Sequence, residues 1–255
     1  MKTKSSFIIV FLLFAGNLFS QKQNDIFQYS VISALMEGNY DGDLKISELK
    51  EKGNFGLGTL NTLDGELVIL DGKFYQVTSE GKVNIPGGET PVPFAVITSF
   101  ESAGNEVAAE DKNLAELTAL LDEQINSKNL IYTFHITGSF SYIKTRSVPA
   151  QQKPYKRLVD VTKNQSEFEF ENIKGTIVGF RFPEFMDGVN VPGYHFHFIS
   201  DDKSSGGHVL DLKSEKILIE FAEAKNFTVE FPGTSDYNQI DLSKRNVQDL
   251  MEAEK

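Results

Sequence analysis

The sequence contains no cysteine among its 255 residues. This absence excludes disulfide bonds, thiolate metal sites, a cysteine nucleophile and a lipid-modified N-terminal cysteine. Tryptophan is also absent, whereas phenylalanine occurs 21 times, which favours a strand-rich core packed with phenylalanine. Without disulfide bonds, the protein must take its stability from the core, a bound metal or association between subunits.

Positive charge is scarce, with 25 lysines and arginines against 36 acidic residues and a net charge of −11 at pH 7. Such a surface repels nucleic acid and anionic lipid, so we expect neither as a partner. The sequence also lacks a G-x-S-x-G nucleophile elbow, a P-loop and a dinucleotide fingerprint, since "GLG" at 56–58 is too short to count. Nucleotide chemistry and a serine nucleophile therefore have no support.

The first twenty residues have the layout of a secretory signal. Lys2 and Lys4 precede the apolar run Phe7–Ala15, and a small residue follows at Ser20. Nine apolar residues are too few for a bilayer-spanning helix, which needs roughly 20. We therefore predict a signal peptide over 1–20 and an exported protein, periplasmic or extracellular, that interacts with no membrane after cleavage. The alternative is an N-terminal helix of the fold itself.

Short apolar runs broken by Gly, Asp and Asn predict a mixed, strand-rich α/β fold with a few helices. Asp-Gly pairs at 64–65 and 71–72 favour tight turns on each side of a strand over Glu66–Leu70. Leucines at helical spacing predict a helix over Asn113–Asn126, and Ile26–Met36 is also predicted to be helical.

The chain after the signal is predicted to form two domains. The first is an α/β domain with a mixed sheet over 21–150, and it includes consecutive strands at Leu130–Thr137 and Ser139–Arg146. The second is β-rich, covers 151–255, and carries a histidine-bearing hairpin and a terminal helix. Mixed and antiparallel sheets flanked by a few helices are therefore expected.

Three of the four histidines, His195, His197 and His208, lie within fourteen residues. Alternation along a strand places the first two on one face, with Cα atoms roughly 6.5–7 Å apart. A turn over 201–204 would set His208 opposite His197. Three imidazoles without a thiolate predict a catalytic zinc site, although iron, nickel or manganese fit the same ligand type, and the alternative is a solvated polar face. His135 has no partner nearby in the sequence.

Three charged residues are further candidates. Arg146 shares a strand face with Tyr142 and Lys144, which is typical of a solvated face, yet its planar fork would suit a substrate carboxylate. Glu66 begins an otherwise apolar strand face, so it lies at a wet rim or acts as an acid–base group. Glu254 falls in line with the apolar stripe of a predicted C-terminal helix, or in a solvated tail.

Over almost the whole mature chain, the sequence resembles the acetolactate decarboxylase family. The stretches that carry the resemblance are "GLGTLNTLDGELVILDGKFYQ", "PFAVITSF", "TRSVPAQQKPY", "GTIVGFRFPEFMDGVNVPGYHFHFISDD" and "GGHVLDL". The resemblance implies two α/β domains, a homodimer formed by sheet extension, and a zinc enzyme that converts 2-acetolactate to (R)-acetoin and carbon dioxide. It also implies that the zinc ligands are His195, His197 and His208.

The resemblance assigns further roles to four residues. Arg146 would hold the departing carboxylate while the metal stabilises the enediolate that remains. Glu66 or Glu254 would deliver the proton that fixes the product's configuration, and Thr59 would lie close to the substrate.

Two other readings use the same histidines. An exported zinc hydrolase would activate water there, and its activity should survive the loss of Arg146. A non-catalytic zinc-binding or carbohydrate-binding domain would hold the metal in full coordination and show no turnover.

Overall fold

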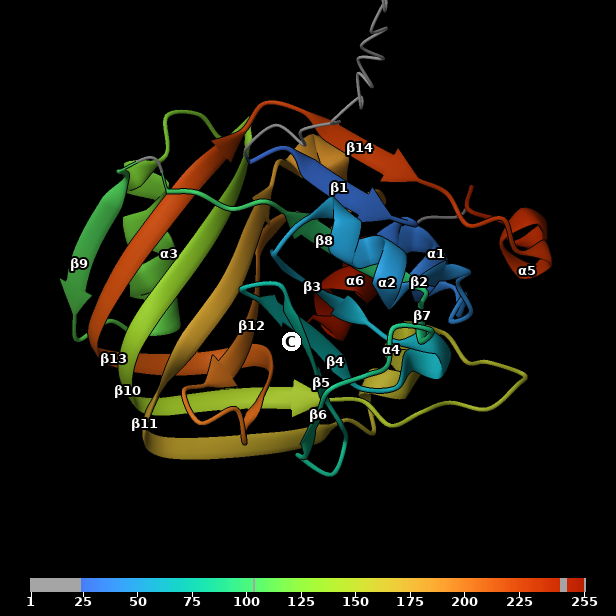
Figure 1. Ribbon diagram of the computed structural model, residues 1–255, viewed down its shortest axis with the longest axis horizontal. Helices are drawn as coiled ribbons and strands as arrows, with labels where there is room; N and C mark the ends of the chain where they lie inside the picture. Colours follow the sequence, from blue (N-terminus) through green and yellow to red (C-terminus); the bar gives the residue numbers. More distant parts are fainter. Residues whose placement is uncertain (1–23, 103, 244–246, 255) are drawn as a thin grey trace, which may run out of the picture.

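The computed structural model describes residues 24–102, 104–243 and 247–254. The predicted signal peptide lies outside these residues. Within them, no helix is both long and apolar enough to cross a membrane. Two large sheets and a few short helices make up the molecule (Figure 1), which confirms the predicted strand-rich α/β class.

The first large sheet has seven strands in the order β14-β1-β8-β3-β4-β5-β6, all antiparallel to their neighbours except the parallel pair β1–β14. β4 and β5 form the hairpin predicted from Asp71–Gly72, whose φ angles of 51° and 71° fit a tight turn. The strands of this seven-stranded sheet are β1 (Ile26–Tyr29), β3 (Phe55–Thr59), β4 (Glu66–Leu70), β5 (Lys73–Val77), β6 (Val83–Asn84), β8 (Phe94–Thr98) and β14 (Phe227–Glu230).

The second large sheet has the order β10-β11-β12-β13-β9, and β10 also pairs with β13, so four strands close a ring. The two strands predicted around residue 138 are one long strand, which bends where its register with β13 shifts, beginning at Ser139/Phe140. Gly138 permits this course, because its φ is +153° and a Cβ there would lie 2.1 Å from the Lys216 carbonyl oxygen. The strands are β9 (Glu106–Glu110), β10 (Ile131–Ser147), β11 (Ser166–Phe182), β12 (Gly193–Ser200) and β13 (Gly206–Ala224).

The two sheets face each other across a shared apolar core. Phe55, Val68 and Val96 of the first sheet pack with Val178 and Phe180 of the second. Burial of these side chains on both sheets holds the faces together. His197 of the second sheet hydrogen-bonds the Leu67 carbonyl of the first, so the candidate site described below also joins the two sheets.

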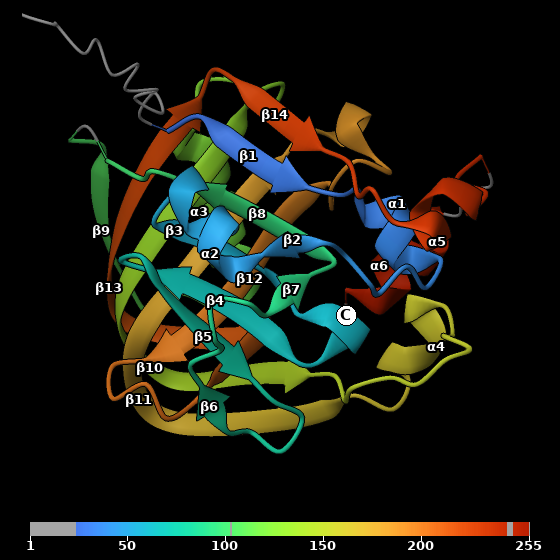
Figure 2. The same cartoon turned by 45° about the vertical axis from the view of Figure 1, so that its right-hand side comes forward.

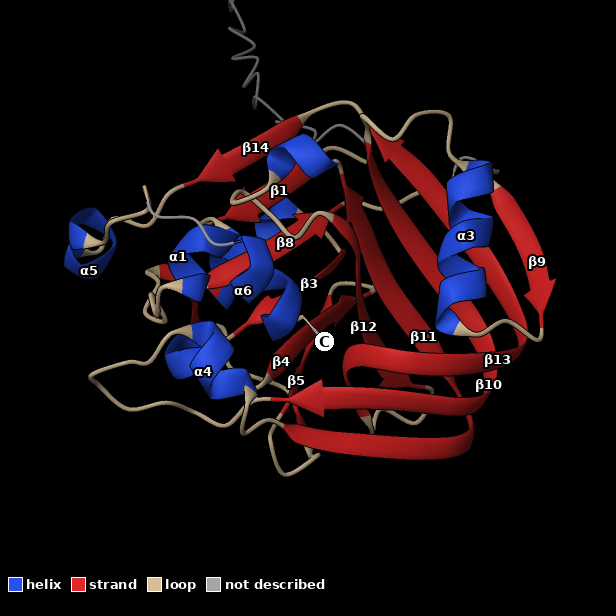
Figure 3. Ribbon diagram, turned by 180° about the vertical axis from the view of Figure 1, so that it is seen from behind, coloured by secondary structure: helices blue, strands red, loops and turns tan. Residues whose placement is uncertain are grey.

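Helices cover the outer surfaces (Figure 3). α3, capped by Asn113, packs Leu117 and Leu121 on the second sheet, as the leucine spacing predicts. α1, α4 and α6 gather at the opposite end of the molecule. The helices are α1 (Ile32–Met36), α2 (Ile46–Leu49), α3 (Leu114–Gln124), α4 (Leu158–Thr162), α5 (Ser235–Gln239) and α6 (Val247–Ala253), with 3-10 turns at Lys50–Lys52, Asn61–Leu63 and Glu184–Met186 and a small sheet of β2 (Leu44–Lys45) and β7 (Pro91–Val92).

The predicted helix over Ile26–Met36 is wrong in its first half. Residues 26–29 form β1, which lies between β8 and β14 (Figure 2). Pairing with β14, about two hundred residues later, overrides the local helical preference.

Sheet membership does not follow the boundary predicted at residue 150. β10 precedes that boundary and pairs with β11, whereas β14 follows it and returns to β1. The division into two domains stays a prediction.

Candidate active site

The hairpin of β12 and β13 brings the three clustered histidines together. His197 and His208 are register partners across the hairpin, as predicted, although the turn spans residues 201–205. His195, His197 and His208 are 7%, 1% and 3% exposed, so they are not the solvated histidines of the alternative reading. One ligand nitrogen from each lies within 4.8 Å of the others.

Hydrogen bonds fix the tautomers of two of these rings. A carbonyl oxygen can only accept, so His197 Nδ1 donates to the Leu67 carbonyl at 2.9 Å, and its Nε2 carries a lone pair. In the same way, His208 Nε2 donates to the Glu254 carbonyl at 3.3 Å, which leaves the lone pair on Nδ1. His195 Nε2 lies 3.1 Å from that nitrogen. Two backbone carbonyls therefore leave the lone pairs of these rings on His197 Nε2 and His208 Nδ1.

These donors fit a divalent metal ion. Two nitrogens on one tetrahedral zinc lie roughly 3.3 Å apart, close to the 3.1 Å between His195 Nε2 and His208 Nδ1. Three atoms of the histidines and Glu254 are buried and have no hydrogen-bond partner: His195 Nδ1, His197 Nε2 and Glu254 Oε2. Buried polar atoms are rarely left unsatisfied, so their arrangement indicates a site for an ion.

The three rings are neutral, which is the form that binds metal. Burial, reinforced by the positive charge of Arg146, lowers the pKa of His195 to about 3. Burial also lowers the pKa values of His197 and His208 well below their usual range. Imidazoles that resist protonation keep their lone pairs available to a metal across neutral pH.

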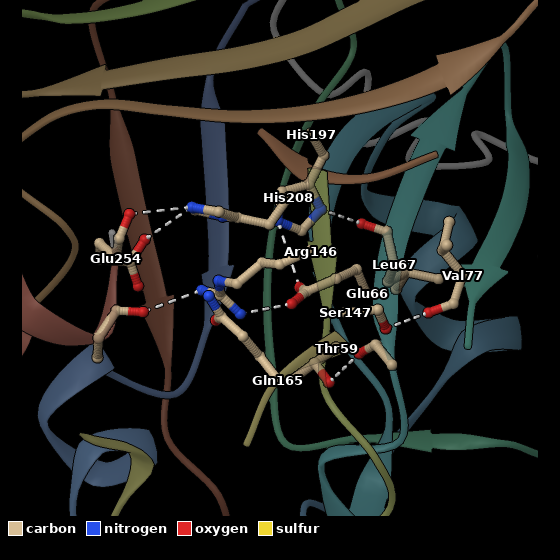
Figure 4. A network of polar contacts seen from close by, with 12 residues as sticks. Thr59, Glu66, Leu67, Val77, Arg146, Ser147, Gln165, His197, His208 and Glu254 are labelled. Carbon is tan, nitrogen blue, oxygen red and sulfur yellow. Dashed lines mark hydrogen bonds and ion pairs between the residues drawn. The ribbon is translucent and has the colours of Figure 1, made fainter. Parts of the chain in front are cut away.

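Arg146 and Glu66 form a buried ion pair beside the histidines (Figure 4). Arg146 Nη1 donates to Glu66 Oε1 at 2.7 Å, and Nη2 donates to the Ala253 carbonyl at 3.2 Å. The other Glu66 oxygen lies 3.5 Å from His197 Nε2. Burial raises the pKa of Glu66 to about 7 against the lowering effect of Arg146. The structure thus excludes both the wet rim for Glu66 and the solvated face for Arg146.

Glu254 closes the cluster from the other side. It directly follows α6, its amide donates to the Leu250 carbonyl at 3.1 Å, and its side chain is 14% exposed. Its carboxylate lies 3.7 Å from His195 Nε2 and 3.8 Å from His208 Nε2. Burial raises the pKa of this carboxyl group. The stripe predicted to align with Glu254 included Leu250 and Met251; Leu250 is buried as expected, whereas Met251 is 58% exposed.

Thr59 lies beside Glu66 as its register partner in the β3–β4 pair. Its hydroxyl donates to the Gly65 carbonyl at 2.7 Å, which fixes the turn that leads into Glu66. Thr59 also lines the pocket that contains Glu66, Arg146 and Glu254.

His135, by contrast, lies apart from this cluster. Its Nδ1 pairs with Glu220 Oε2 at 3.0 Å, and its ring packs against Phe55 and Phe100. It is a packed strand residue, as its isolated position in the sequence suggests.

Sequence reasoning missed the backbone oxygens of this site. The carbonyls of Leu67, Ala253 and Glu254 orient His197, Arg146 and His208, respectively. No side-chain pattern marks a carbonyl group. The only available signal was their position at or beside the two candidate glutamates.

A larger hollow lies elsewhere, between α3 and the start of β12, and contains Asp122, Arg181 and Tyr194. Tyr194 and Lys128 both hydrogen-bond Asp122 there. We place the chemistry in the smaller pocket, because it is lined by His195 and His197, by both carboxyl groups with raised pKa values and by Arg146.

The sequence profile of the alpha-acetolactate decarboxylase family matches residues 26–244. A relative from Methanosarcina mazei with that name is 46% identical over 230 residues, which cover 90% of this chain and 80% of the relative. The chain belongs to the alpha-acetolactate decarboxylase family. An alpha-acetolactate decarboxylase from Brevibacillus brevis is 43% identical over 232 residues, covering 91% and 81% of the two chains.

The fold agrees with a solved member of the alpha-acetolactate decarboxylase family. The crystal structure of alpha-acetolactate decarboxylase from Bacillus subtilis superposes with a TM-score of 0.88 at 35% identity, covering 91% of this chain and 99% of that one. The family resemblance, the fold class and the assignment as a decarboxylase enzyme are thereby confirmed. The non-catalytic reading is not supported.

Proposed function

We propose that this protein decarboxylates 2-acetolactate to (R)-acetoin and carbon dioxide at a zinc site made by His195, His197 and His208. The observation that carries the proposal is the buried trihistidine cluster with Arg146 and two protonatable carboxyl groups around it, in a chain of this family. The substrate is a β-keto acid that also carries a hydroxyl group. It therefore offers two neighbouring oxygens to a metal and one carboxylate to an arginine.

Zinc bound to the histidines supplies a Lewis acid for the negative charge that grows on the substrate's oxygens as carbon dioxide leaves. The bond between the carboxylate carbon and the hydroxyl-bearing carbon breaks, and its electron pair moves toward the ketone oxygen. A proton then adds to the hydroxyl-bearing carbon and gives acetoin. No oxidant or reductant is required.

Arg146 binds and orients the substrate carboxylate. Two of its nitrogens are engaged by Glu66 and the Ala253 carbonyl, while its buried Nε has no partner. A guanidinium that is only partly paired can accept a further carboxylate through its remaining donors. Because the backbone and Glu66 hold the guanidinium in place, the carboxylate is fixed in one orientation during bond cleavage.

Glu66 or Glu254 supplies the proton. With a pKa of about 7, Glu66 is partly protonated at neutral pH, and burial raises the pKa of Glu254 in the same direction. Carboxyl groups tuned this way are effective general acids. The two lie on different sides of the histidines, so delivery from one fixed side gives a single configuration at the new centre.

An apolar wall suits the two methyl groups of the substrate. It is contributed by α1, by the turn before β4, by β8, by the residue after β10 and by α4, while Thr59 lies at the polar side. Apolar side chains also limit the entry of water, which strengthens the interactions of Arg146 inside the pocket. The wall residues are Ile32, Leu35, Leu63, Phe94, Val148 and Leu158.

We also propose that the protein is exported and forms a homodimer. The export proposal is supported by the charge and hydropathy pattern of residues 1–20. The dimer proposal is supported by family resemblance. Analytical ultracentrifugation of the protein that begins at Gln21, and N-terminal sequencing of secreted material, would test these two proposals.

The proposed reaction is tested by incubating the protein with racemic 2-acetolactate and analysing acetoin by chiral chromatography. We expect catalytic formation of (R)-acetoin with one carbon dioxide per acetoin. Folded, zinc-loaded protein that releases no acetoin above the spontaneous rate would refute the proposal.

A further inference from the structure

Three short helices from distant parts of the chain form one side of the pocket. α1 and α4 have five residues each and α6 has seven. Ile32 and Leu35 of α1, Leu158 of α4 and Glu254 after α6 all line the pocket. Helices this short are not stable alone, so contacts with neighbours must set their positions.

One side chain joins all three helices. Arg157, the residue before α4, donates from Nη2 to Glu37 Oε1 at 2.7 Å and from Nε to both Glu37 oxygens at 3.1 Å. Its Nη1 lies 2.8 Å from Asp249 Oδ2. Glu37 caps α1, and Asp249 is in the first turn of α6. Arg157 therefore bridges α1 and α6 from the start of α4.

The geometry of this bridge differs from that of an ordinary surface ion pair. The side chain of Arg157 is 39% exposed, but those of Glu37 and Asp249 are only 27% and 18% exposed. The planar guanidinium of Arg157 binds both oxygens of the Glu37 carboxylate and, at the same time, the Asp249 carboxylate. It therefore fixes both the distance and the angle between these two carboxylates. An isolated exposed pair would fix neither.

The position of α6 matters because the end of this helix carries three groups of the site. The Glu254 carboxylate borders the histidines. The carbonyls of Ala253 and Glu254 accept hydrogen bonds from Arg146 and His208, respectively. The apolar contribution comes from Leu250 and Ala253, which are buried with α1 and α4. Apolar packing tolerates sliding and rotation more readily than a forked ion pair does.

We infer that Arg157 is a positioning residue, which holds α6 against α1 and α4 and thereby keeps the Glu254 carboxylate at the metal site. The inference rests on the proposed function, since Glu254 is there one of the two carboxyl groups proposed to deliver the proton. It makes Arg157 necessary for the full rate of turnover without any contact with substrate or metal.

A double-mutant cycle tests whether Arg157 acts through Glu254. Because an ångström-scale misplacement of a catalytic group can cost on the order of 10²-fold, we expect Arg157→Gln to lower kcat at least about tenfold with a smaller change in KM. In a Glu254→Gln background the same change should lower kcat less than about twofold, because the positioned group is already lost. Arg157→Lys should recover part of the activity.

Lys163→Gln is the matched control. It removes one positive charge from the residue after α4, where Lys163 pairs with Asp160 at 2.9 Å in an exposed i,i+3 pair. We expect kcat within about twofold of the wild type. The inference is overturned if Arg157→Gln leaves kcat unchanged, or if its effect multiplies fully with that of Glu254→Gln.

Hydrogen exchange of the zinc-loaded proteins gives a reading that does not depend on turnover. The amide of Glu254 and its neighbours in α6 should exchange faster in Arg157→Gln than in the wild type or Lys163→Gln, while β4 and β12 exchange as before. Unchanged exchange in α6 would overturn the inference. If the wild type makes no acetoin but α6 still exchanges faster in Arg157→Gln than in the wild type, the proposed function is refuted. The role of Arg157 in placing α6 is then left intact.

Discussion

At the scale of single residues, two of the three histidines of the cluster are held by the backbone and the third is not. His197 and His208 are each held by a backbone carbonyl, and His195 is placed by its neighbours on β12. Hydrogen bonds from the non-ligating nitrogen fix ring orientation and raise the basicity of the ligand. The site should therefore be formed before metal binds.

His208→Ala should abolish stable zinc binding. Loss of one of three nitrogen donors should weaken affinity at least about 10²-fold. Zinc content after dialysis, measured by atomic emission, should fall from about one per chain toward zero. His135→Ala is the control and should keep its zinc, because His135 pairs with Glu220 away from the cluster. Equal zinc content in the two variants would contradict the assigned ligands.

Arg146→Gln should lower kcat/KM at least about 10²-fold, because the variant loses a buried charged partner of the substrate carboxylate and leaves Glu66 unpaired. Arg181→Gln removes another buried arginine, on β11, whose Nη1 donates to the Lys128 carbonyl at 3.0 Å. Both variants should be less stable, but only the first should lose activity. Retained activity in Arg146→Gln would instead favour a hydrolase-like use of the metal.

At the scale of elements, the hairpin of β12 and β13 was predictable because its determinants are local. Alternation and a turn of suitable composition are enough to set His208 opposite His197. Helical phase likewise put Glu254 in line with Leu250, which is buried, whereas its place at the site was implied only by the family resemblance. The burial of Arg146 and Glu66 was not predictable, since it depends on how α6 and the two sheets close over the end of β10.

Gly207 shows how an element positions the site. Its φ is +128°, and a Cβ there would lie 2.5 Å from the Arg146 carbonyl oxygen. Gly207→Ala should therefore displace the start of β13, and with it His208, at a cost of at least about 1–3 kcal/mol. Both the melting temperature and zinc affinity should fall.

Gly72→Ala is the matched control for that change. Gly72 also has a positive φ, of +71°, but a Cβ there would meet nothing within 4 Å. Gly72→Ala should lower the free energy of unfolding only by the cost of placing alanine at a positive φ, and its zinc affinity should be unchanged. If Gly207→Ala bound zinc as tightly as Gly72→Ala, the close approach of β13 to Arg146 would not matter for the site.

For the whole molecule, the buried titratable groups make stability of the metal-free protein depend on pH. Burial lowers the pKa of His195 to about 3 and those of His197 and His208 well below 6.5. Below about pH 6.5 the unfolded chain therefore binds protons at these histidines that the folded protein does not bind, and stability falls as the pH falls. The raised pKa of Glu66, about 7, acts in the opposite sense between that pH and about 4.5, and the raised pKa of Glu254 has an effect of the same sign. Stability should therefore fall most steeply below about pH 4.5.

Urea unfolding of the metal-free protein at several pH values measures this slope. The unfolded wild type binds more protons than the folded wild type, and His195→Asn lowers this difference by one proton. Between pH 4.5 and 3.5, the slope of its free energy of unfolding against pH should therefore be smaller than that of the wild type by about 1.4 kcal/mol per pH unit. Identical slopes in the wild type and the variant would show that His195 is not held neutral by the fold.

The long-range pairings of the whole molecule explain the main error of the sequence analysis. β1 is a strand because β14 and β8 flank it, and the site is complete only when residues from β3, β4, β10, β12, β13 and the end of α6 converge. Neither fact has a local signal. The bridge made by Arg157 between Glu37 and Asp249 is hidden for the same reason.

The central claim is that a metal in the trihistidine site is required for decarboxylation. The most direct test is to remove the metal with a chelator, add zinc back in known amounts, and follow acetoin release together with bound zinc. We predict activity that is lost with the metal and returns in proportion to zinc until about one ion is bound per chain. Full activity in metal-free protein would contradict the account.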